Sequence, residues 1–156
     1  MTVNKQHQVF RALVEYVQPS YDELRKIFGR DVDEDYDIEL RENMFEAVGD
    51  CLNVSRESRE LDFVFFVSDC GHEDTILREM ANVGLRPALY EEFISCFKAH
   101  SIEFSDGVIA LGSKKRVNHW EGVATVYWDC FGWSLTLPVM GLNGTWGVTK
   151  YLAVRE

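Results

Sequence analysis

The chain has 156 residues, of which 46% are hydrophobic and 13% aromatic, so we expect one packed domain over residues 1–156 rather than a disordered chain. The net charge is −10, and the excess lies in residues 1–79, which hold 19 acidic and 9 basic residues. A field of this sign disfavours nucleic acid and anionic lipid, and it favours basic partners or cations.

The first ten residues, MTVNKQHQVF, lack the apolar segment of a secretory signal, and the apolar run Phe63–Val67 is far too short to span a bilayer. Four cysteines have neither metal-type nor redox-type spacing (Cys51, Cys70, Cys96 and Cys130). We therefore expect a cytoplasmic protein with reduced, mostly buried thiols and no cofactor.

The first half of the chain predicts three helices. Apolar residues from Val9 to Val17 recur at helical spacing, which predicts a helix over residues 5–18 that Pro19 ends. Ser20 and Glu23 have the spacing of a capping box, so a second short helix should begin there and end at Gly29. An acidic loop follows, and then a third helix from about residue 39 to residue 52, weakened near its end by Gly49.

The middle and the end of the chain predict a strand, two more helices and then a sheet. Leu61–Ser68 is the strand, and helices should follow it up to Val83 and again after Pro87. Short strands at 102–104 and 108–111, and longer ones at 122–130, 133–139 and 145–154, should form an antiparallel meander. The expected fold is α+β, with the N-terminal helices and a helical pair packed on one face of a mostly antiparallel sheet that ends in this C-terminal β-meander.

The acidic segment is the strongest chemical feature, because residues 31–50 contain nine acids and one base. On the third predicted helix, the last four of these acids share one stripe at about 100° per residue. We expect the acids of the loop and helix to bind a basic partner: Asp31, Asp33, Glu34, Asp35, Asp37, Glu39, Glu42, Glu46 and Asp50.

A calcium loop is one alternative for this segment. Asp31, Asp33, Asp35 and Glu42 occupy positions 1, 3, 5 and 12 of the calcium-binding loop template. Tyr36 stands at position 6, where the template requires glycine, and the chain has no second such loop. A solvated acidic connection also fits the same residues.

A second alternative places an enzyme site at the turn Asp69–Asp74, between the strand and the next helix. His72 would act as a general base oriented by Asp69 or Asp74, or Cys70 would act as a nucleophile. The plainer interpretation is an ordinary helix start with an exposed His72. Likewise, Gly112–Arg116 resembles half of a phosphate-binding loop, but a solvated turn explains it better.

The leading functional hypothesis is a small intracellular binding protein of the inhibitor or immunity type. Its carboxylates would dock a basic partner protein, such as a nuclease or another nucleic-acid enzyme, without direct contact with nucleic acid or membrane. A small hydrolase or transferase and a calcium-binding protein are the alternatives. The aromatic residues of the meander leave a homodimer open as well.

Overall fold

The computed structural model describes residues 8–28, 45–68, 72–104, 107–117, 120–129, 132–136 and 149–156. Its helices are α1 (Tyr21–Phe28), α3 (Glu73–Asn82) and α4 (Tyr90–His100), with two short 3₁₀ helices, η1 (Gly49–Asn53) and η2 (Ser101–Glu103). Its strands are β1 (Val9–Val14), β2 (Glu46–Ala47), β3 (Arg59–Ser68), β4 (Leu85–Pro87), β5 (Val108–Val117), β6 (Trp120–Asp129), β7 (Gly132–Thr136) and β8 (Thr149–Arg155). The α+β class expected from the sequence is confirmed.

The strands form a mostly antiparallel sheet with the order β1-β3-β8-β5-β6-β7. The short strand β2 pairs with β5, and β4 pairs with β8. Strands β5, β6 and β7 are the expected meander. The last strand was wrongly placed in it, because β8 lies between β3 and β5 and runs parallel to β5. Residues from the end of the chain are therefore at the centre of the sheet.

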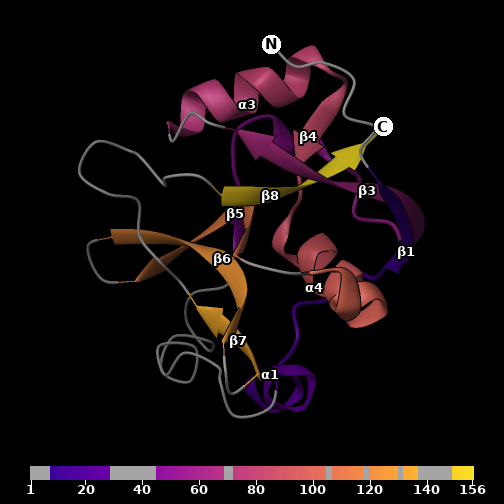
Figure 1. Ribbon diagram of the computed structural model, residues 1–156, viewed down its shortest axis with the longest axis vertical. Coiled ribbons are helices and arrows are strands. Elements are labelled where there is room, and N and C mark those ends of the chain that lie inside the picture. The colour runs from indigo at the N-terminus through magenta and orange to yellow at the C-terminus, as the bar shows by residue number, and fades with distance from the viewer. Residues whose placement is uncertain are drawn as a thin grey trace.

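Helices cover both faces of this sheet (Figure 1). Successive residues of β3 alternate between two buried clusters: Phe63 packs with α1 and α4, and Val64 packs with α3. The same alternation places Leu152 of β8 in the first cluster and Tyr151 in the second. The expectation that the helical pair packs on one face is thus wrong, since α3 and α4 lie on opposite faces.

The predicted helix over residues 5–18 is also wrong, because Val9–Val14 is a strand that pairs with β3. Phe10, Ala12 and Val14 point into the core, while Val9 and Leu13 are exposed. Because both faces of this strand carry apolar residues, the sequence lacks the apolar–polar alternation of a strand, and its apolar residues fall at helical spacing. Pairing with β3, fifty residues away in the chain, decides for the strand.

The end of the third predicted helix is wrong as well. Residues 46–47 form β2 against β5, and residues 49–53 form η1. Gly49 has a φ of +58°, a left-handed conformation that β-carbon-bearing residues rarely adopt, and it breaks the helical pattern. The first part of this predicted helix lies outside the described residues.

The other predicted elements of the middle segment are confirmed. Helix α1 begins with the capping box, in which the Glu23 amide donates to Ser20 Oγ at 3.2 Å and the Ser20 amide to Glu23 Oε1 at 3.3 Å. Strand β3 and helices α3 and α4 also lie where the sequence placed them. None of the described helices is long and apolar enough to cross a bilayer.

Two short segments of the C-terminal half differ from expectation. Residues 101–103 form η2 rather than a strand. Residues 112–116 belong to β5 and not to a solvated turn, and the register against β6 shifts between Ala110 and Lys115. As a consequence Lys115 is fully buried rather than solvated.

Candidate functional site

A cavity of about 450 Å³ opens where the end of β1, helix α1 and helix α4 meet. We call it the β1–α4 groove. The stacked rings of Phe28 and Phe97, with centroids 4.5 Å apart, hold α1 against α4 on one side of it. Its lining residues are Leu13, Glu15, Val17, Pro19, Glu23, Ile27, Glu91, Ile94, Ser95, Lys98 and Ala99.

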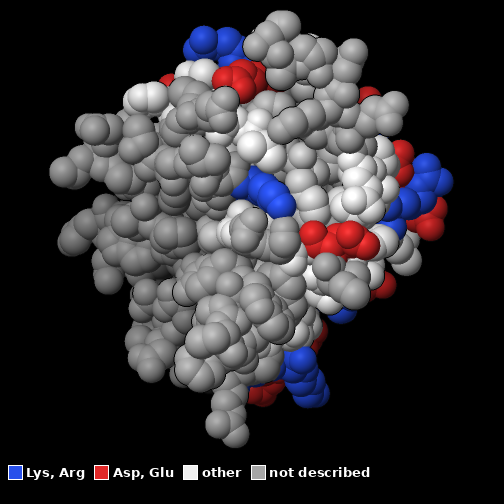
Figure 2. Space-filling view, viewed as in Figure 1, with Lys and Arg blue, Asp and Glu red and all other residues white. Residues whose placement is uncertain are grey.

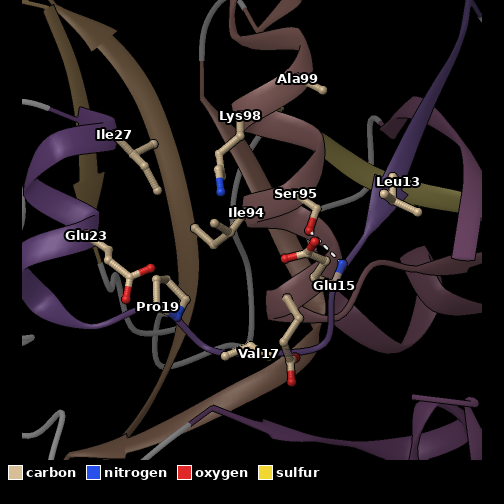
Figure 3. Close-up of a pocket in the computed structure, with 11 residues that line it drawn as sticks. Leu13, Glu15, Val17, Pro19, Glu23, Ile27, Ile94, Ser95, Lys98 and Ala99 are labelled. Carbon is tan, nitrogen blue, oxygen red and sulfur yellow. Dashed lines mark hydrogen bonds between the residues drawn. The ribbon is translucent and has the colours of Figure 1, made fainter. Parts of the chain in front are cut away.

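The polar lining of the groove is mainly acidic, with three glutamates against one lysine. Figure 3 shows Lys98 of α4 reaching into the space between Ile27 of α1 and Ile94 of α4. Glu23 approaches from α1, and Glu15 lies on the strand side, where its amide donates to Ser95 Oγ at 3.4 Å. The remaining walls are largely aliphatic. Such a lining suits a ligand that has both a cationic group and an apolar part.

Glu91 is the buried acid of the groove, only 3% exposed. Its Oε2 accepts hydrogen bonds from Arg56 Nη1 and, at 3.5 Å, from Gln18 Nε2. Its Oε1 has no hydrogen-bond donor among the described residues. The ion pair with Arg56 compensates the charge of this carboxylate within the protein.

A second acid, Glu92, stands beside Glu91 and is satisfied within the protein. It accepts both Nη atoms of Arg86 at 2.7 and 2.8 Å, the Leu89 amide at 2.8 Å and the Tyr16 hydroxyl at 2.6 Å. Burial, followed by this bond to Glu92, raises the pKa of Tyr16 to about 12. The network ties the chain after β1 to the beginning of α4 and keeps this side of the groove in place.

Two described positions that flank residues 29–44 lie near the groove. Helix α1, whose Ile27 lines the groove, ends at Phe28, and the next described residue is Phe45. Gln18 binds both backbone groups of Phe45, accepting from its amide at 3.0 Å and donating to its carbonyl at 2.6 Å. Because Gln18 also donates to Glu91, Phe45 and the groove belong to one hydrogen-bonded cluster.

The structure places only two of the nine acids predicted for partner binding. Glu46 is exposed on β2 and Asp50 is exposed on η1, so these two do not share a helical stripe. The other seven, Asp31, Asp33, Glu34, Asp35, Asp37, Glu39 and Glu42, lie outside the described residues. On the face shown in Figure 2, the described acidic and basic side chains are interspersed and form no continuous field of one sign.

The predicted enzyme site at residues 69–74 is described only in part. His72 precedes the first turn of α3 and is exposed, while Asp69 and Cys70 lie outside the described residues. Asp74 lines a smaller cavity of about 230 Å³ between η1, α3 and β4, together with Cys51. Burial raises the pKa of the Cys51 thiol to about 11, so this thiol is not an activated nucleophile near neutral pH.

The calcium alternative falls on Asp31, Asp33, Asp35 and Glu42, which are outside the described residues. Within the part of the chain that the structure describes, no group of three or more metal-ligating side chains comes together.

Sequence reasoning missed the groove, because its residues come from three separate segments. Glu15 and Glu91 are 76 positions apart, and an acid in the first turn of a helix is common for electrostatic reasons alone. One signal was present: two adjacent glutamates begin a helix whose other early residues, Tyr90 and Phe93, are apolar.

Comparisons with protein-family models, curated proteins and solved structures yield no match to this chain.

Proposed function

We propose that this chain is a small cytoplasmic binding protein of the inhibitor or immunity type, which docks a basic partner protein. The contact region in this proposal is the β1–α4 groove together with the acidic segment of residues 31–50. The observation that carries the proposal is the groove itself, which is lined by Glu15, Glu23 and the buried Glu91 together with one lysine, with Glu91 also ion-paired to Arg56.

The acidic segment and the groove have complementary roles in this proposal. Nine acids against one base over residues 31–50 create an attraction that acts before contact and speeds the encounter with a basic surface. The groove then supplies fixed carboxylates and aliphatic walls for one cationic side chain and its hydrocarbon stem. Affinity is expected to fall as salt is added, because screening shortens the range of the attraction.

The class of partner follows from this charge. A nuclease or another nucleic-acid enzyme presents basic residues where it binds phosphates, and carboxylates compete for the same surface. The protein itself is then not expected to bind nucleic acid or membranes. Two buried free thiols, Cys51 and Cys96, agree with a reducing, cytoplasmic compartment.

The first experiment compares variants that change the charge of the groove without disturbing its walls. The immobilised wild-type chain is used to retain proteins from the native host, which are identified by mass spectrometry, and the dissociation constant of each basic protein is then measured. Lys98→Gln removes the groove's cation and should tighten binding about fivefold, corresponding to ~1 kcal/mol of relieved repulsion. Lys26→Gln, on the exposed side of α1, is the matched control and should leave the affinity unchanged.

A loss-of-charge variant completes this experiment. Glu91→Gln keeps the size of the buried side chain and should weaken binding about tenfold or more, because a desolvated ion pair is lost. If Lys98→Gln and Glu91→Gln both bind the partner like the wild type, the groove has no part in docking and the proposal fails there.

The acidic segment is tested by charge reversal. Replacing Glu39, Glu42 and Glu46 by lysine should lower the association rate at low salt, and the dissociation rate should change less. Stopped-flow or surface-based kinetics at two salt concentrations measure this directly. An association rate that stays constant at low salt contradicts the role given to the segment.

A further inference from the structure

We draw no further inference here: the strongest candidate, the cavity of about 230 Å³ between η1, α3 and β4, carries none, because the cations of its described lining are already paired with glutamates of the protein and its remaining charged residues, Asp50 and Asp74, are exposed acids for which nothing in the structure shows a ligand.

Discussion

Gly112 lies at a position where the absence of a β-carbon allows close packing against the sheet. Its amide donates to the Ala88 carbonyl at 2.9 Å, and its own carbonyl accepts from the Val48 amide at 3.0 Å. A Cβ at this position would lie 2.5 Å from Ala88 O and 2.7 Å from Ala88 C, both of which are backbone atoms. The glycine thus lets three separate segments approach within hydrogen-bonding distance.

Gly112→Ala is therefore expected to lower the free energy of unfolding by about 1–3 kcal/mol, because the backbone must move to make room. Gly107→Ala is a matched control, since Gly107 has open space around the position of an added Cβ and no positive φ. Urea unfolding of both variants measures the difference. An equal stability of the two would show that the approach at Ala88 is readily relaxed.

At the scale of elements, the start of α4 is held by ions that are almost completely buried. The Glu92 side chain is fully buried and the Arg86 side chain is 12% exposed, so neither is well solvated. Arg86 also contacts Glu156 at 3.1 Å, which brings the C-terminal residue of the chain to the same cluster. Strand β4, helix α4 and the end of β8 are joined through these side chains.

Glu92→Ala is expected to destabilise the protein by about 3–5 kcal/mol, because it leaves Arg86 with a buried charge and the Leu89 amide without its acceptor. Glu57→Ala, an exposed acid in the loop before β3, should change stability by no more than about 0.5 kcal/mol. Thermal or urea unfolding of the two variants provides the comparison. A loss at Glu92 no larger than at Glu57 would mean that the network adds nothing to stability.

Strand β1 shows why one element was misassigned. Its outer residues Val9 and Leu13 are apolar although they are exposed, so the alternation of a half-buried strand is absent from the sequence. These exposed apolar side chains therefore obscured the pattern that marks a strand.

For the whole molecule, the centre of stability should be β3. It pairs with β1 over Arg59–Val64 and with β8 over Asp62–Ser68, and Phe63 and Val64 are fully buried on opposite faces. Both edges and both faces of this strand are therefore covered by described residues.

Native-state hydrogen exchange should accordingly be slowest for amides in the Phe63–Phe66 stretch, which open only on global unfolding. Amides of the short 3₁₀ helix η1 should exchange faster through local opening. Two-dimensional NMR of the exchanging protein resolves the two groups. Exchange at Phe63 as fast as at Cys51 would contradict the layered core described above.

The sequence by itself determined the features that depend on neighbours in the chain. The capping box of α1, the apolar run of β3 and the β5–β6–β7 meander are local patterns, and each was recognised. The excess of acidic residues in the first half of the chain was also evident from the sequence, because it depends only on the number of charged residues in each half.

Only the tertiary structure decided what depends on distant segments. Long-range pairing decides the strand character of residues 9–14, the central place of β8 and the separation of α3 and α4 onto opposite faces. It also places Glu15 and Glu91 in the lining of one cavity. Such pairing selects among local conformations of similar free energy, and a single chain read in order does not reveal which distant segment will supply it.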